Sequence, residues 1–148
     1  MVTETSAYLM LLGSAFLSAT LLPGSSEAVL IGFLASAKGQ PGLLIAVATV
    51  GNVAGSVANY ALGYFAQRFK DKPWFPISDA TNARAQRWFA KYGVWSLLLS
   101  WVPIVGDPLT LIAGAMRVRL LPFLVLVTVG KLSRYGLVAA LWVWWGAV

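Results

Sequence analysis

The first half of the chain alternates apolar runs with short polar breaks. An apolar run over residues 7–22 ends at Pro23 and Gly24, and a shorter run follows over 26–37. The first run is shorter than the roughly 20 residues that a spanning helix needs. We therefore expect a re-entrant helical hairpin, which enters the membrane and leaves on the same side, with one kinked crossing helix as the alternative. Residues 43–66 then predict a full-length spanning helix.

The second half repeats this pattern. An apolar run over residues 94–102 ends at Pro103 and Gly106, a run over 108–116 follows, and residues 121–145 predict a second spanning helix. The two prolines stand 80 residues apart, and each is followed four residues later by an acid. Because one crossing separates the two hairpins, they must enter from opposite sides. We therefore expect an all-α integral membrane fold built as an inverted repeat.

Composition also places the chain in a membrane. It is 59% hydrophobic and 11% charged, with a mean hydropathy of +0.76, whereas a soluble domain carries about 25% charged residues. The chain contains no cysteine and no histidine, which excludes disulfides, thiolate chemistry and the usual base near neutral pH. We therefore expect no enzyme activity, no cofactor, no bound metal and no nucleic-acid partner.

A polar stretch separates the repeats without marking a second domain. We expect one membrane domain over residues 1–148, with repeat one over 7–66 and repeat two over 94–148. Residues 67–93 predict a loop and an amphipathic interfacial helix whose cations face lipid headgroups. The N-terminus carries no positive charge before its first apolar run, so we expect residues 7–22 to belong to the mature protein.

Basic residues gather on one side of the predicted topology. The side with both termini carries only Lys38. The other side carries Arg68, Lys70, Lys72, Arg84, Arg87, Lys91, Arg117 and Arg119. Cytoplasmic segments are enriched in lysine and arginine. We therefore expect the 67–91 loop in the cytoplasm and both termini outside.

The first predicted spanning helix carries a narrow polar face. Asn52 and Ser56 lie on it, beside Gly51 and Gly55. Small residues at this spacing favour a tight seam with another helix. The same face could instead form one wall of a polar cavity, and the sequence leaves both interpretations open.

Four charged residues fall inside the apolar region: Glu27, Asp107, Lys131 and Arg134. A lone charge at the bilayer centre costs at least about 2.5–3.5 kcal/mol, so we expect mutual pairing or water. In a structural interpretation, Asp107 caps a helix that starts with Pro108. Ser25 or Ser26 would cap the helix that carries the other acid, and the two bases would neutralise the acids.

In a functional interpretation, the same residues form a transport site. Helix N-termini near the membrane centre offer free N–H groups to an anion. Lys131 and Arg134 add cationic partners for a phosphate. Glu27 and Asp107 could take up protons, because a low-dielectric surrounding favours the neutral form of a carboxyl group.

Motifs along nearly the whole chain carry a family resemblance. They are FLSATLLPGSSE at 16–27, ATVGN at 48–52, RWFAKYG at 87–93, LLLSWVP at 97–103, GD at 106–107 and AGAMR at 113–117. With these motifs the sequence resembles the DedA family of bacterial inner-membrane proteins, within the superfamily of the eukaryotic VTT-domain proteins. More narrowly, it resembles the short YqaA-like branch. The resemblance implies the inverted re-entrant fold, a bacterial inner-membrane location and a role in lipid traffic.

The resemblance also implies roles for single residues. Glu27 matches the acid of the first hairpin, and Arg117 matches the arginine after the second. Larger relatives carry arginines on both sides of the second-hairpin proline, where this chain has Ser100 and Gly106. The phosphate-binding arginines therefore cannot be transferred, and Lys131 with its neighbour Arg134 are the candidates to replace them.

The predicted function is translocation of an anionic lipid, such as undecaprenyl phosphate or a phospholipid, with protons as a possible coupling ion. This is what the family resemblance implies, because relatives are implicated in moving such lipids, and the resemblance also suggests a link to the proton-motive force. One alternative is a proton- or ion-coupled carrier for a small solute. The other is a non-transporting scaffold that docks partners through the basic stretch 84–95. The sequence leaves the substrate, the direction of transport and a homo-oligomer open.

Overall fold

The computed structural model describes residues 3–20, 24–66, 68, 79–102 and 105–146, which form helices and turns and no strand. The helices are α1 (Glu4–Thr20), α2 (Ser25–Ala35), α3 (Pro41–Ala66), α4 (Asp79–Tyr92), the 3₁₀ helix η2 (Gly93–Trp101), α5 (Gly106–Ala115) and α6 (Leu120–Gly146). The two long apolar helices are confirmed, because α3 and α6 have the length and composition to cross a membrane. The predicted breaks at Pro23 and Pro103 lie outside the described residues.

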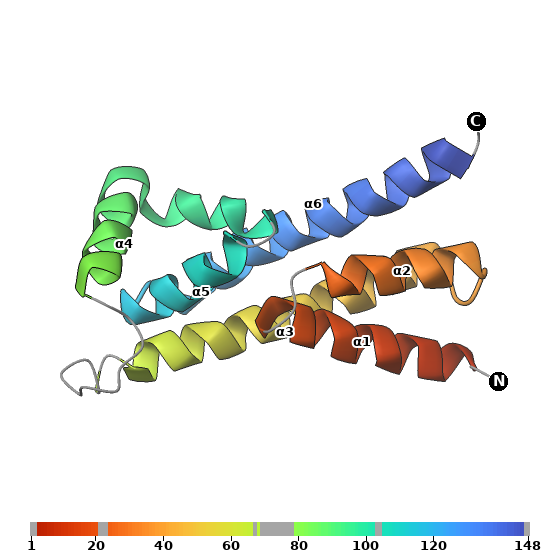
Figure 1. Cartoon of the computed structure of the whole chain (residues 1–148), viewed down its shortest axis with the longest axis horizontal. Coiled ribbons are helices and arrows are strands. Elements are labelled where there is room, and N and C mark those ends of the chain that lie inside the picture. The colour runs from red at the N-terminus through yellow and green to blue at the C-terminus, as the bar shows by residue number, and fades with distance from the viewer. Residues whose placement is uncertain (1–2, 21–23, 67, 69–78, 103–104, 147–148) are drawn as a thin grey trace.

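The short helices lie in pairs along opposite ends of α3. Figure 1 shows α1 and α2 beside the end at which α3 begins, and η2 and α5 toward the end at which it finishes. The Tyr8 hydroxyl of α1 accepts the backbone N–H of Gln40 at 3.1 Å, and the Ala19 carbonyl accepts the Asn59 amide at 2.8 Å. The helix α2 returns toward the end where α1 began (Figure 1).

Small residues let α1 pack closely on α3. A Cβ atom added at Gly51 would lie 3.0 Å from the Cβ of Ala15, and Gly55 faces Ala19 in the same way. Ser56 is buried in this region and donates to a carbonyl of its own helix at 3.0 Å. The polar face of α3 is therefore partly the tight helix seam that small residues allow.

A second glycine seam joins α3 to α5. A Cβ atom at Gly63 would overlap the Leu111 carbonyl, and one at Gly114 would overlap the Tyr60 carbonyl. The backbones of the two helices are thus in direct contact, which any side chain larger than hydrogen would prevent. This seam connects the first half of the chain to the second.

Two apolar clusters form the core. One contains Leu11, Ala15, Leu30, Leu44, Ala48 and Tyr135. The other contains Phe89, Leu97, Leu109, Ala113, Phe123, Leu126 and Val127. Helix α6 contributes residues to both clusters, so it packs against both halves.

The two short-helix pairs differ in their first member. α1 is an α-helix of 17 residues, whereas η2 is a 3₁₀ helix of nine residues. Runs of 3₁₀ helix beyond three or four residues are uncommon. The 3₁₀ helix η2 makes two close backbone contacts. Gly106 lies against the backbone of Ser100, and Gly130 lies against the Leu98 carbonyl.

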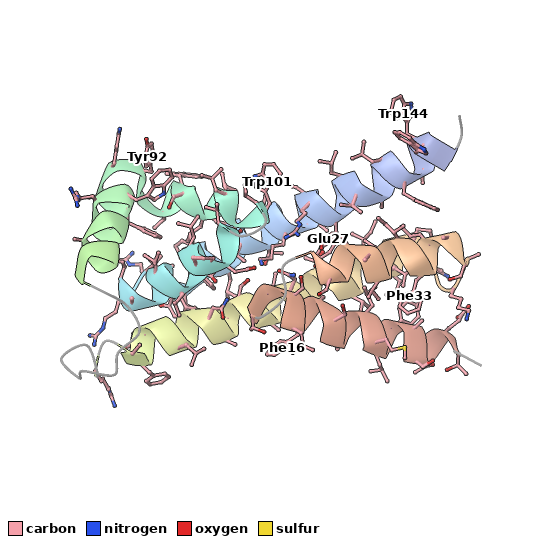
Figure 2. All side chains as sticks on the ribbon, viewed as in Figure 1. Phe16, Glu27, Phe33, Tyr92, Trp101 and Trp144 are labelled. Carbon is pink, nitrogen blue, oxygen red and sulfur yellow. The ribbon has the colours of Figure 1, made fainter. Side chains whose placement is uncertain are left out.

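Aromatic side chains mark both ends of the molecule. Tyr92 lies at the end where α4 is found, and Trp144 lies at the opposite end, near the C-terminus (Figure 2). Arg87 and Lys91 are exposed on α4, and Trp88 is also partly exposed. Aromatic residues and cations of this kind are typical of membrane–water interfaces. The side chain of Arg84 lies outside the part that the structure describes.

Candidate functional site

Two acid–base pairs lie between the helices. Lys131 Nζ lies 3.0 Å from Asp107 Oδ1, and Arg134 forms an ion pair with Glu27. Both bases come from α6, one turn apart, whereas the acids come from α5 and α2. The four charges of the apolar region therefore pair with one another and link α6 to both short-helix pairs. Figure 2 shows Glu27 near the middle of the molecule.

The bases are more deeply buried than the acids. The side chain of Lys131 is 1% exposed, and that of its partner Asp107 is 20% exposed. The side chain of Arg134 is 10% exposed, against 15% for Glu27. The largest difference is between Lys131 and Asp107, and the Asp107 side chain is the most exposed of the four charged groups.

A chain of hydrogen bonds joins the two pairs. Lys131 also donates to the amide oxygen of Asn52, whose Nδ2 donates to the Tyr135 hydroxyl at 2.9 Å. That hydroxyl lies 2.8 Å from Ser26 Oγ, which lies 3.2 Å from Glu27 Oε2. The three linking side chains are almost completely buried. Networks of this kind are costly to leave partly unpaired.

The first turns of α2 and α5 do not support the capping interpretation. α2 begins at Ser25 and α5 begins at Gly106, and neither start has a side-chain cap hydrogen bond. The Asp107 carboxylate and the Ser26 hydroxyl instead contact α6. The N-cap residue of α5 is Val105, so the prediction that Asp107 caps this helix is wrong. Gly24, before α2, adopts a left-handed conformation with φ of 92°, which glycine adopts without strain.

The remaining predicted site residues lie at different distances from the pairs. Ser25 is half-buried in the first turn of α2. Ser56 is buried one turn after Asn52 and bonds to the backbone of its own helix. Arg117 is exposed beyond the end of α5, where its guanidinium lies 5.1 Å from the centre of the Tyr64 ring. The structure therefore does not bring Arg117 to the acid–base pairs.

Tyr135 is the member of the network that the sequence analysis missed. It follows Lys131 by four residues, so the two side chains lie on the same helix face one turn apart. This spacing inside an apolar helix is the signal that could have identified it. Ser18, whose hydroxyl lies 3.2 Å from that of Ser26, has no comparable signal in the sequence.

A cavity of about 330 Å³ lies between η2 and α6. Leu98, Trp101 and Leu137 are among its apolar lining residues. Ser133 and Arg134 also line it, and Arg134 is the one charged residue among the described residues of its wall. Figure 2 shows Trp101 at the end of η2, next to α6. The cavity therefore combines apolar walls with a charged residue, Arg134, which is itself paired with Glu27.

Comparisons with known proteins agree with this membrane architecture. The model of the VTT domain family matches residues 6–143. Inner membrane protein YqaA of Escherichia coli (strain K12) is 42% identical over 147 residues, which cover 97% of this chain and 99% of that protein. An uncharacterised protein of Haemophilus influenzae is 38% identical over 133 residues, which cover 82% of this chain and 78% of that protein.

A more distant relative carries a functional name. Undecaprenyl phosphate transporter A of Staphylococcus aureus is 31% identical over 75 residues, which cover 48% of this chain and 37% of that protein. No solved structure is significantly similar to this chain. The family match over most of the chain and the near full-length similarity to YqaA agree with the motifs read from the sequence, and the chain therefore belongs to the VTT-domain, or DedA, family of membrane proteins.

Proposed function

We propose that this protein is a translocase that moves an anionic lipid, such as undecaprenyl phosphate or a phospholipid, across the bacterial inner membrane. The observation that carries the proposal is the pair of buried acid–base contacts at Lys131 and Arg134, with an apolar cavity that leads to the second of them. Buried ion pairs are a weak source of stability, and charges inside a membrane mark transport pathways. The names of the two bacterial relatives support the location and a lipid phosphate as cargo.

The proposal includes a membrane arrangement. The α1–α2 pair and the η2–α5 pair are re-entrant hairpins that enter from opposite sides, and α3 and α6 cross. The placement of the two pairs along opposite ends of α3 supports this inverted repeat (Figure 1). The basic residues on and around α4 favour a cytoplasmic 67–91 segment, with both termini outside.

The geometry links anion binding to proton uptake. A headgroup that enters the cavity meets Arg134 already paired with Glu27, so it must compete with a carboxylate. Protonation of Glu27 removes this competing charge and frees the guanidinium to bind phosphate through two parallel hydrogen bonds. Protonation of Asp107 likewise removes the negative charge that competes with an anion for Lys131. Transport by this route needs no covalent chemistry, so in this proposal the protein acts as a lipid transporter and not as an enzyme.

We expect Glu27→Gln and Asp107→Asn to slow lipid movement by at least about tenfold, because each removes about 1.4 kcal/mol or more of charge-dependent interaction. Both substitutions keep the side-chain volume but remove the negative charge of the carboxylate. In the proposed route, the paired base must separate from this carboxylate and pair with it again. The measurement uses proteoliposomes with a labelled phospholipid or a labelled polyprenyl phosphate. An impermeant quencher reports the lipid in the outer leaflet, with and without a pH gradient.

The matched control is Arg87→Gln, which removes an exposed cation on α4 and should leave the rate within about twofold of the unmodified protein. If the unmodified protein moves neither lipid under either condition, the translocase proposal fails. Uptake of a small solute that an uncoupler abolishes would then favour the carrier. Stable capture of one partner protein, unaffected by both acid substitutions, would favour the scaffold.

The absence of native cysteine allows a direct test of the topology. We expect Thr3→Cys and Lys38→Cys to react with an impermeant maleimide added to intact spheroplasts, and Arg87→Cys to react only after lysis. Thr3 and Lys38 flank the α1–α2 pair, so a re-entrant hairpin places them on the same side. Labelling of only one of these two positions in intact spheroplasts would show that the pair crosses the membrane.

A further inference from the structure

The Tyr135 hydroxyl lies in the middle of the hydrogen-bond chain that joins the two ion pairs. Its side chain is completely buried, and it contacts Asn52 on α3 and Ser26 on α2. It is thus the point where the hydrogen bonds from the Asp107 side meet those from the Glu27 side. Its position on α6, between helices from both ends of the molecule, makes it the only described side chain that bonds to both Asn52 and Ser26.

The lysine at the start of this chain fixes the first link. A charged lysine can only donate, so the oxygen of the Asn52 amide must face Lys131 and its NH₂ group must face Tyr135. The Tyr135 oxygen accepts from that NH₂ group, and its own proton is available for Ser26. When Tyr135 donates in this way, Ser26 has its proton left for Glu27 Oε2 or for Ser18.

We propose that Tyr135 is a positioning residue that couples the two ion pairs, so that the charge state of Asp107 sets the ease with which Glu27 takes up a proton. The role that we give to this coupling rests on the proposed function. In that role, the coupling keeps the two carboxylates from being neutralised independently of each other. It is nevertheless a property of the resting protein that can be measured without any lipid.

The physical route of this coupling runs through the Asn52 amide. When Asp107 is neutral, Lys131 is a buried cation without an anionic partner, which is costly enough that it releases its proton to solvent. A neutral lysine amine accepts as well as donates, so it no longer fixes the amide. The amide can then turn and present its oxygen to Tyr135, whose proton now points to Asn52. Ser26 donates to the oxygen of Tyr135 in place of Glu27. The Glu27 carboxylate thereby loses a hydrogen bond that favours its charged form.

Through-space charge acts on Glu27 as well. Its ion-pair partner is Arg134, and the Lys131–Asp107 pair lies one helix turn away along α6. Neutralising Asp107 and Lys131 removes one negative and one positive charge from that pair, which changes the electrostatic field at Glu27 whether or not the Tyr135 hydroxyl is present. A single substitution therefore cannot separate the two effects, but a comparison with and without the Tyr135 hydroxyl can.

The experiment follows the protonated carboxyl band of Glu27 by infrared spectroscopy of the full-length protein in detergent. The band is assigned by its loss in Glu27→Gln. The midpoint of its pH titration is measured with and without Asp107→Asn, first in the unmodified protein and then with Tyr135→Phe. Through-space charge is nearly the same in both backgrounds. We expect the midpoint shift caused by Asp107→Asn to differ between the backgrounds by at least about one pH unit, equal to about 1.4 kcal/mol.

Two further variants keep the test decisive if Tyr135→Phe is poorly folded. Ser26→Ala removes the donor to Glu27 and should change the Asp107→Asn shift in the same direction. Ser56→Ala removes a buried hydroxyl that bonds only to its own helix, and should leave the shift unchanged. Equal shifts in the unmodified, Ser26→Ala and Ser56→Ala backgrounds would overturn the coupling.

The outcomes also separate this inference from the proposed function. Coupling without any lipid movement would refute the translocase proposal and leave the inference intact. Lipid movement with identical shifts in all backgrounds would refute the inference alone.

Discussion

Replacing Lys131 by methionine should destabilise the protein by about 3–5 kcal/mol, the cost of breaking a buried ion pair by removing one partner. Lys131 is 1% exposed and holds both the Asp107 carboxylate and the Asn52 amide oxygen. Methionine fills a similar volume but donates no hydrogen bond, so both acceptors lose their partner. For a chain of this size the loss corresponds to a fall of about 6–20 °C in Tm, measured by circular dichroism in detergent.

The Lys131→Met prediction has an internal rescue. Adding Asp107→Asn removes the unpaired charge, so the double variant should recover much of the lost Tm. Lys91→Met is the matched control, because Lys91 is exposed on α4 and its loss should change the free energy of unfolding by less than about 1 kcal/mol. A Tm for Lys131→Met within 2 °C of that of the Lys91→Met control would show that the buried pair contributes little.

Alanine at Gly114 should have an effect of similar size, about 3 kcal/mol or more, because overpacking against a rigid neighbour exceeds the usual cost of about 1–3 kcal/mol. The added methyl group would overlap the Tyr60 carbonyl of α3. That neighbour is backbone, so it cannot rotate away as a side chain would. We expect a large loss of folded protein after detergent extraction, measured by size-exclusion chromatography and by Tm.

Two glycines in comparable helices provide controls for Gly114→Ala. A Cβ atom at Gly32 on α2 or at Gly136 on α6 would meet nothing within 4 Å. Alanine has a helix propensity up to about 1 kcal/mol better than glycine, so these variants should be as stable as the unmodified protein or slightly more stable. If Gly114→Ala behaves like these controls, the close α3–α5 contact does not exist in solution.

The repeat pattern could be read from the sequence because it depends on local properties. Length, hydropathy and the positions of proline and glycine defined the two long helices and the shorter runs beside them. The charges in the apolar region predicted mutual pairing, because an isolated charge there is too costly. The choice of partners could not be predicted, since it depends on which helices lie side by side. Asp107 pairs with Lys131, and Glu27 pairs with Arg134.

Two features were hidden for different physical reasons. The segment Gly93–Trp101 has apolar residues that suit an α-helix, yet it forms a 3₁₀ helix in close contact with Gly106 and Gly130. Both contacts lie outside the segment itself, Gly106 in the helix that follows it and Gly130 on α6, so the composition of the segment does not reveal them. The capping interpretation of Asp107 failed because a local rule competed with a tertiary partner, and the buried lysine was the stronger attraction for the carboxylate.

The first half of the chain packs against helices of the second half, and this has a consequence for biosynthesis. α3 belongs to the first half but needs α5 to cover its Gly63 surface, and Asn52 needs Tyr135 and Lys131 from α6. When the ribosome has released only the first 66 residues, none of these partners has been made. The nascent first half is therefore in the membrane before its final contacts can form. The Gly63 surface is uncovered, and the Asn52 amide lacks its final partners. Completion of the last helix, and not insertion of the first, is the step that commits this protein to its folded state.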